Sequence, residues 1–216
     1  MPVPFVLASQ SPARLATLRS AGVEPVVVVS DVDEDAALDV ARRQHAAAGW
    51  GPLAAADAVL VLARAKAEAV AAAARRDAIV LGCDSMLELD GEILGKPADA
   101  ATAIDRWRTM RGHRGVLHTG HWLVDDRDSG TGGTGGTLGA TSSTVVRFAR
   151  LSDAEIDAYV ATGEPLKVAG AFTVDGLGGP YVEAIEGDYH GVVGVSLPLL
   201  RTLLGELGVL FHDLRA

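Results

Sequence analysis

The segment AIVLGCDSMLELDGEIL, residues 78–94, decides the fold class. Its first six residues are apolar or small, as in a buried strand, and Asp84 and Ser85 follow directly. From residue 86 onward the segment has Asp90-Gly91 at its centre, a dipeptide typical of tight turns, and it predicts a β-hairpin. Open α/β sheets bind ligands at the carboxyl ends of their strands. Asp84 is therefore a metal ligand, a general base toward water, or the cap of a turn.

The part of the chain before this segment alternates between strands and helices. Ser11 and Pro12 have the residue types of a helix N-cap and first helical position, and Gly22 has that of a helix end. The elements predicted here are strands at residues 3–8 and 25–30, the second of them buried, and helices at residues 12–21, 36–50 and 53–76.

The part after the segment adds longer strands. Ser152 and Glu155 have the spacing of a capping box. Residues 125–143 include GTGGTGGTLG, but no Lys-Ser/Thr pair and no helix follow, so a flexible hairpin connection is favoured over a phosphate-binding loop. The elements predicted here are helices at residues 97–110, 152–161 and 197–207 and strands at residues 115–124 and 144–150. The whole pattern predicts an α/β fold with some antiparallel pairing.

Composition excludes several classes of protein. The 216 residues are 49% hydrophobic and 22% charged, which allows a substantial core. The formal net charge of −9 argues against a nucleic-acid partner. The one cysteine, Cys83, excludes an internal disulfide and suits the reducing cytoplasm. No apolar stretch reaches the length of a membrane span, and the first residues do not resemble a signal peptide, so a cytoplasmic protein is expected.

Two further groups of residues could bind a phosphorylated ligand or its metal. Ser9, Ser11 and Arg14 lie at the start of the first predicted helix, where backbone N–H groups and the helix dipole favour phosphate oxygens. An ordinary helix cap is the alternative. Glu34 belongs to the acidic run at residues 31–35, which could hold Mg²⁺ or Mn²⁺ or could be a solvated loop.

Two lysines complete the candidate site. Lys66 lies on an alanine-rich helix, and Lys96 lies between the hairpin and the next helix. A lysine is a compact charge suited to a phosphate chain, although surface lysines are common. Together with Asp84 and Glu34 they have the composition of a cleft for a metal and a nucleotide.

These groups follow the order and spacing of the motifs of the Maf family, also called septum formation proteins, and the chain resembles an actinobacterial-type member. The matching segments are LASQSPARLATLRSAGV, SDVDE, ARAKAEAV, VLGCDSMLELDGEILGKPAD, MRGHRGVLHTGH, LSDAEIDAYVATGEPLKVAGAFTVDGLGG and IEGDYHGVVGVSLPLL. The resemblance implies one domain over residues 1–216, with two lobes around a cleft and a flexible loop at about residues 125–143. Its sheet would be mixed and elongated, with flanking helices and a central cleft, similar to that of the inosine triphosphate pyrophosphatases.

The resemblance also implies an activity. Members of this family hydrolyse nucleoside triphosphates to the monophosphate and pyrophosphate with Mg²⁺ or Mn²⁺, and a homodimer is compatible with the family. Carried over to this chain, the resemblance makes Asp84 the catalytic proton acceptor and, together with Glu34, a metal ligand. It makes Lys66 and Lys96 catalytic through stabilisation of charge on the phosphate chain. The alternative is a nucleotide-binding regulator of cell division and septation with little turnover.

The resemblance assigns phosphate binding to Ser9 and Arg14 but does not settle the nucleobase. Family members that prefer dTTP and UTP carry Arg, Thr and Gln at the places of Ala13, Ser85 and Asp175. Asp175 could accept hydrogen bonds from a guanine edge. The pattern favours a modified or non-adenine nucleotide and a house-cleaning role, with Ser85 and Asp175 binding the substrate.

Overall fold

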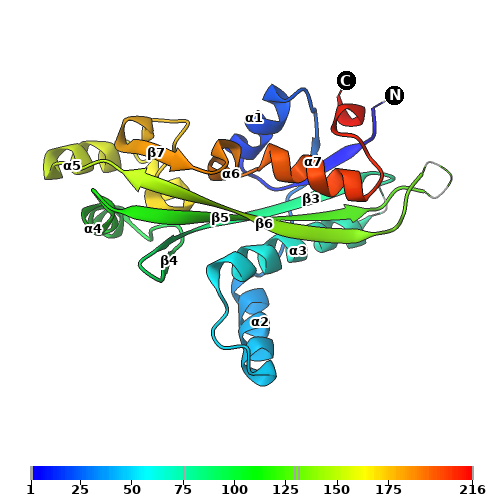
Figure 1. Ribbon diagram of the computed structural model, residues 1–216, viewed down its shortest axis with the longest axis horizontal. Helices are drawn as coiled ribbons and strands as arrows, with labels where there is room; N and C mark the ends of the chain where they lie inside the picture. Colours follow the sequence, from blue (N-terminus) through cyan, green and yellow to red (C-terminus); the bar gives the residue numbers. More distant parts are fainter. Residues whose placement is uncertain (1, 75, 129, 131, 216) are drawn as a thin grey trace.

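The computed structural model describes residues 2–74, 76–128, 130 and 132–215, and within them seven strands form one mixed sheet (Figure 1). The order across the sheet is β2-β1-β3-β5-β6-β7, and β4 also pairs with β3. The strands are β1 (Phe5–Ala8), β2 (Val26–Val27), β3 (Ile79–Leu89), β4 (Glu92–Leu94), β5 (Arg114–Asp125), β6 (Thr137–Phe148) and β7 (Val182–Glu186). The predicted α/β class with a mixed sheet is confirmed.

Helices cover both faces of this sheet. In Figure 1, α3 lies on one face with α2 projecting away beyond it, and α1, α6 and α7 lie on the other face, while α4 and α5 lie at one end. The helices are α1 (Pro12–Ser20), α2 (Glu34–Ala48), α3 (Ala55–Ala73), α4 (Ala100–Met110), α5 (Asp153–Ala161), α6 (Tyr189–Val193) and α7 (Leu197–Glu206). Short 3₁₀ turns are η2 (Pro165–Lys167), η3 (Ala169–Ala171), η4 (Gly179–Tyr181) and η5 (Phe211–Leu214).

The edge of β3 opposite β5 is divided between two partners. β1 pairs in parallel with the first half of β3, as far as Ala8 opposite Gly82. β4 pairs antiparallel with the last part, from Leu87 onward. Among the described residues, no strand pairs with residues 83–86 on this edge, although β5 pairs with them on the other edge. The sheet is therefore split at the middle of β3.

This split corrects the predicted position of Asp84. The sequence placed Asp84 directly after a strand that ended at residue 83, but β3 continues through it to Leu89. The strand does not stop at the polar residues because β5 pairs with it without a break, from Ile79 opposite Asp125 to Glu88 opposite Val116. Asp84 lies beside an opening because the neighbouring strand β1 stops pairing at Gly82. β3 itself continues past Asp84.

The valine-rich run at residues 25–30 was predicted as a buried strand, and this prediction was wrong. Only Val26–Val27 pair as β2, at the outer edge of the sheet, and Val26 remains 61% exposed. An edge strand has a neighbour on one side alone, so an apolar sequence does not guarantee burial. Glu34 consequently does not follow a strand; it is the first residue of α2, whose N-cap is Asp33.

Two glycines let α3 lie directly on the sheet. A Cβ atom at Gly82 would lie 2.1 Å from the carbonyl oxygen of Ala63, and one at Gly120 would lie 2.4 Å from that of Val59. Alanine on the helix side completes this close contact, as at Ala67. The alanine-rich composition of α3 thus serves packing as well as helix formation.

Several local predictions are confirmed. Asp90 and Gly91 both have positive φ at the β3–β4 turn, and α5 begins with a complete capping box between Ser152 and Glu155. The predicted hairpin connection at residues 125–143 is shorter than expected, because β5 and β6 extend into it; residues 129 and 131 of it lie outside the described residues.

Within the part of the chain that the structure describes, no helix combines the length and apolar character needed to cross a bilayer.

Candidate active site

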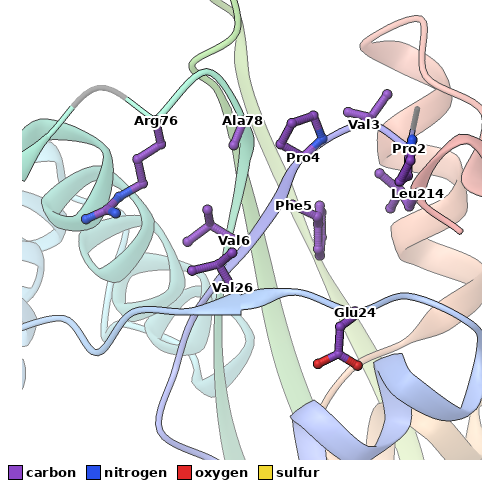
Figure 2. Close-up of a pocket in the computed structure, with 10 residues that line it drawn as sticks. All are labelled: Pro2, Val3, Pro4, Phe5, Val6, Glu24, Val26, Arg76, Ala78 and Leu214. Carbon is purple, nitrogen blue, oxygen red and sulfur yellow. The ribbon is translucent and has the colours of Figure 1, made fainter. Parts of the chain in front are cut away.

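The structure has a small hollow and a large cleft. The hollow, shown in Figure 2, has a volume of about 370 Å³ and is lined mainly by apolar residues near both chain ends. Its acid, Glu24, is already paired with Arg19. The cleft has a volume of about 970 Å³. It opens at the split in the sheet, between the portion of β3 that pairs with β1 and the portion that pairs with β4. Every residue that the sequence singled out for the site, from Ser9 to Asp175, lines this cleft.

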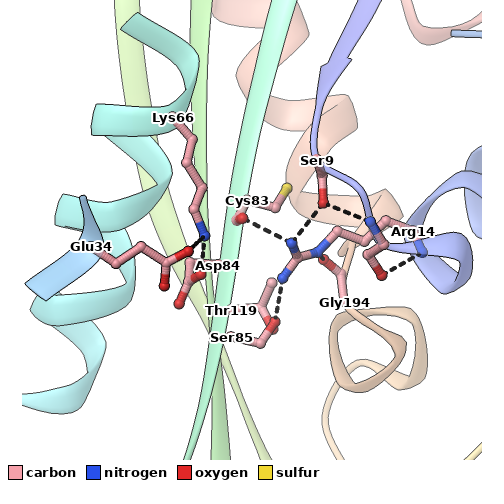
Figure 3. Close-up of polar contacts among 10 residues, drawn as sticks. Ser9, Arg14, Glu34, Lys66, Cys83, Asp84, Ser85, Thr119 and Gly194 are labelled. Carbon is pink, nitrogen blue, oxygen red and sulfur yellow. Dashed lines mark hydrogen bonds and ion pairs between the residues drawn. The ribbon is translucent and has the colours of Figure 1, made fainter. Parts of the chain in front are cut away.

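Three charged side chains meet on the α3 side of the split (Figure 3). The ammonium of Lys66 lies 2.5 Å from Oδ1 of Asp84 and 2.8 Å from Oε1 of Glu34. The side chains of Lys66 and Asp84 are 12% exposed, whereas that of Glu34 is 53% exposed. Two carboxylates face one ammonium, so the group carries an excess negative charge. This charge favours an additional cation at the same place.

The close packing of α3 creates this contact. Ala63 and Ala67 of α3 lie against Gly82, two residues before Asp84 in β3. Lys66 lies on the same helix and reaches Asp84 across this interface. The contact between the backbones of α3 and β3 therefore fixes the point from which the long, flexible Lys66 side chain extends.

The other side of the split is organised by Arg14. Its guanidinium donates hydrogen bonds from Nη1 to Oγ of Ser9 at 3.0 Å and to the Cys83 carbonyl at 2.9 Å. Nη2 donates to Oγ of Ser85 at 3.1 Å, and Nε donates to the Gly194 carbonyl at 3.1 Å (Figure 3). The bond to Cys83 occupies a carbonyl in the part of β3 that no strand covers on this edge within the described residues.

The two serines of the first motif differ in their contacts. Ser11 is the N-cap of α1, and its hydroxyl accepts from the Arg14 backbone N–H at 3.4 Å. Ser9 is buried, and its hydroxyl accepts from the Ser11 N–H and from Arg14. Both the cap expected from sequence and a polar wall of the cleft are therefore present at this helix start.

β3 separates neighbours that the sequence placed together. Asp84 faces α3 and Ser85 faces α1 and α6, since successive side chains of a strand point to opposite faces. Ser85 also exchanges a hydrogen bond with Thr119 at 2.9 Å, and Thr119 donates to the Gly191 carbonyl at 2.8 Å. Thr119 is a site residue that the sequence analysis did not identify, because only strand pairing places it opposite Ser85.

The remaining predicted residues lie farther along the cleft wall. Lys96 and Asp175 are both exposed there, without a direct contact to the three charged side chains. Lys167 lines the same wall, and so does Glu164, which was also missed. The glycines within residues 176–179 are the sequence feature that could have pointed to Glu164, because the chain at Gly176 and Gly178 lies against its carboxylate.

The donor set can be tested against the divalent metal that the sequence analysis expects. Within the described residues, no three His, Cys, Asp or Glu side chains are grouped as a metal site. Glu34 and Asp84 nevertheless direct one oxygen each at the same ammonium. Mg²⁺ typically uses one or two carboxylates and takes its other ligands from substrate phosphates and water. These two residues fit such a metal, with the substrate completing its coordination.

Cys83 does not take part in this chemistry. It is fully buried in β3, and burial raises the pKa of its thiol to about 12. The thiolate is the reactive form of cysteine, so the side chain acts as a small apolar residue.

Comparison with known proteins shows the family of this chain. The family model described as Maf-like protein matches residues 4–207. The chain belongs to the Maf family. Curated relatives of this Maf-family chain, each named nucleoside triphosphate pyrophosphatase, include proteins of Streptomyces avermitilis, Salinispora tropica and Streptomyces coelicolor. The first is 53% identical over 95% of this chain and 91% of its own length, the second 54% over 97% and 86%, and the third 50% over 98% and 94%.

Proposed function

We propose that this chain hydrolyses a nucleoside triphosphate to the nucleoside monophosphate and pyrophosphate with the aid of a divalent metal. The observation that carries the proposal is the convergence of Glu34, Lys66 and Asp84 at the split in the sheet, in a cleft large enough for a nucleotide. Membership of the Maf family and the names of the relatives support it.

The reaction joins a water oxygen to the α-phosphorus and breaks the bond from that phosphorus to the bridging oxygen. Asp84 accepts the proton of the water, and pyrophosphate leaves with the electron pair of the broken bond. Asp84 suits this role because its carboxylate lines the cleft and is largely buried. Lys66 and Lys96 offset the charge that develops on the bridging oxygen and on pyrophosphate.

Glu34 and Asp84 are the residues that would hold the metal, for the reasons given above. When bound, Mg²⁺ or Mn²⁺ supplies positive charge to the phosphate chain and polarises the water. Arg14 contributes differently from the phosphate contact expected from the sequence. Four of its five N–H groups already donate within the protein, so it positions Ser9 and Ser85 and leaves one N–H for substrate.

The substrate base that we favour presents two adjacent N–H donors on one edge, as guanine does with its N1–H and N2 amino group. Asp175 is exposed on the cleft wall and can accept such hydrogen bonds. We propose with it a house-cleaning role toward modified or non-adenine nucleotides. Cytoplasmic location and a homodimer remain predictions from the sequence.

Pyrophosphate release from a panel of canonical and modified triphosphates tests the proposal. Wild type with Mg²⁺ or Mn²⁺ is expected to release pyrophosphate, and EDTA is expected to abolish the release. Asp84→Asn should lower turnover by about 10²-fold or more, because a general base contributes roughly 10²–10⁴-fold. Asp105→Asn, an exposed aspartate on α4 that pairs with Arg108, is the matched control.

The outcomes separate the alternatives. If Asp84→Asn keeps more than about a tenth of wild-type turnover, the base role assigned to Asp84 is wrong. If wild type binds nucleotides and releases no pyrophosphate from any of them, the regulator of cell division becomes the better hypothesis.

A further inference from the structure

Part of the cleft wall is formed by a loop, residues 173–178. Residues 173–178 have the sequence Thr-Val-Asp-Gly-Leu-Gly, which contains an acid and no cation. Asp175 and Leu177 of this loop both line the cleft, and Leu177 is 58% exposed. A carboxylate repels a phosphate chain, whereas an exposed leucine offers an apolar surface to a flat ring. Asp175 and Leu177 therefore suit the base of a nucleotide better than its phosphate chain, whereas Lys96 on the same wall is left to the phosphates.

One carboxylate holds most of this loop in place. Glu164 Oε1 accepts hydrogen bonds from the Thr173 hydroxyl at 2.5 Å and from the Gly178 N–H at 3.1 Å. Its Oε2 accepts from the Leu177 N–H at 3.1 Å. The hydroxyl of Tyr159, a buried residue of α5, also donates to Oε1, at 3.0 Å. Glu164 thus ties both ends of the loop to α5.

Glycines allow the loop to wrap closely around this carboxylate. A Cβ atom at Gly176 would lie 2.6 Å from Oε2 of Glu164, and one at Gly178 would lie 2.4 Å from the Tyr159 hydroxyl. Burial acts to raise the pKa of Glu164, but the hydrogen bonds from Thr173, Leu177, Tyr159 and Gly178 outweigh it and lower that pKa. Four donors and a charged acceptor define one arrangement of the loop.

We propose that Glu164 is a positioning residue that fixes residues 173–178 as the wall against which the nucleobase binds. Glu164 acts through the loop: it sets where the Asp175 carboxylate and the Leu177 side chain face the cleft. This inference rests on the proposed nucleotide substrate. It separates the cleft into a phosphate end near Lys66 and a base end near Leu177.

Binding of two ligands that differ by the presence of a base tests this inference. Calorimetry would compare inorganic tripolyphosphate with an α,β-methylene nucleoside triphosphate, each with Mg²⁺, for wild type and Glu164→Gln. The substitution keeps the shape of the side chain but turns one acceptor into a donor that faces other donors. Glu206→Gln, at the exposed end of α7, is the matched control.

The expected result is about tenfold weaker binding of the nucleotide analogue to Glu164→Gln, the effect of one lost hydrogen bond to a charged group, with unchanged binding of tripolyphosphate. In steady-state assays KM should rise by a similar factor while kcat stays within about twofold of wild type. Hydrogen exchange at the Leu177 and Gly178 amides should become faster. If Glu164→Gln does not fold, Thr173→Val removes one donor from the same carboxylate and replaces it in the experiment.

Two results would overturn the inference. Equal weakening of both ligands would show that Glu164 supports the whole cleft, and unchanged binding of both would show that Glu164 does not position a base-binding wall. The activity is tested separately, because pyrophosphate release by wild type does not depend on the effect of Glu164→Gln.

Discussion

Asp84 and Ser85 are neighbours in the chain, yet β3 turns them to opposite faces, and the polar groups on the two faces are satisfied in different ways. On the α3 face, Lys66 lies between two carboxylates and the group keeps an excess negative charge. On the face toward α1 and α6, Arg14 donates to four protein acceptors, and Ser85 continues the network to Thr119.

The difference predicts that the two faces of β3 have different roles. Charges that are incompletely balanced can bind a further cation and can stabilise charge that develops during a reaction. Hydrogen-bond donors that are nearly all used within the protein mainly maintain the shape of the cleft, because they hold the elements around it together. Substitutions on the first face should therefore affect turnover, and those on the second should affect stability.

The largest expected effect is on turnover. Lys66→Gln should lower kcat for pyrophosphate release by about 10²-fold, because it removes the positive charge that stabilises the reacting phosphates in the proposed mechanism. Arg64→Gln is the control, since Arg64 lies on the same helix but pairs with Glu68 and stacks on Trp122, outside the lining of the cleft. An exposed pair contributes little, so Arg64→Gln should stay within about twofold of wild type. Equal losses in the two variants would remove the distinction between the faces.

The next largest effect is on the packing of α3 against the sheet. Gly82→Ala should lower the free energy of unfolding by about 3 kcal/mol, because its Cβ would overlap the backbone of α3 at Ala63. Urea denaturation measures it. Gly205→Ala in α7 is the control: a Cβ there meets nothing within 4 Å, so a small gain is expected. A stable Gly82→Ala variant would mean that α3 can move away from β3 at little cost.

Arg14→Lys tests the second face directly. Lysine cannot reproduce the fork of N–H donors, so Ser9, Ser85 or a carbonyl loses its partner. We expect the free energy of unfolding to fall by about 2 kcal/mol. Arg201→Lys, at an exposed position of α7, should leave it unchanged. If Arg14→Lys is as stable as wild type and only turnover falls, Arg14 belongs functionally with the charged face.

The smallest expected effect is a pH dependence of stability on the second face. His121 is buried: its Nε2 accepts from the Ser196 N–H at 2.8 Å, so the ring is neutral. Burial, aided by the charge of Arg14, lowers the pKa of His121 to about 4. The unfolded chain binds a proton near pH 6.5 and the folded chain does not, so stability falls as pH decreases between these values.

Between pH 6.5 and 5.5 His121 should contribute a loss of about 1 kcal/mol in the free energy of unfolding. His121→Gln has no titrating group at this position and should show a smaller change over that interval, measured by urea denaturation at each pH. A steeper change in the variant than in wild type would contradict the assignment of a neutral ring.

Features that depend on neighbours in sequence were predicted well. The capping box at Ser152 and the turn at Asp90-Gly91 arise from residues within a few positions of each other, so local conformation alone specifies them. The prediction for residues 25–30 failed because burial depends on what lies across the sheet, and nothing local reports that β2 is an edge.

The sequence by itself determined the α/β class, most helices, the family, and the residue types of the proposed metal–nucleotide site. Only the tertiary structure decided how those residues meet. It placed Asp84 within β3, opposite a gap between two strands, and it separated Asp84 from Ser85. It also brought Glu164 to a loop nine and more residues away. The physical reason is that strand pairing and close helix packing bring together groups that are distant in the chain, and the local pattern of residues does not encode those contacts.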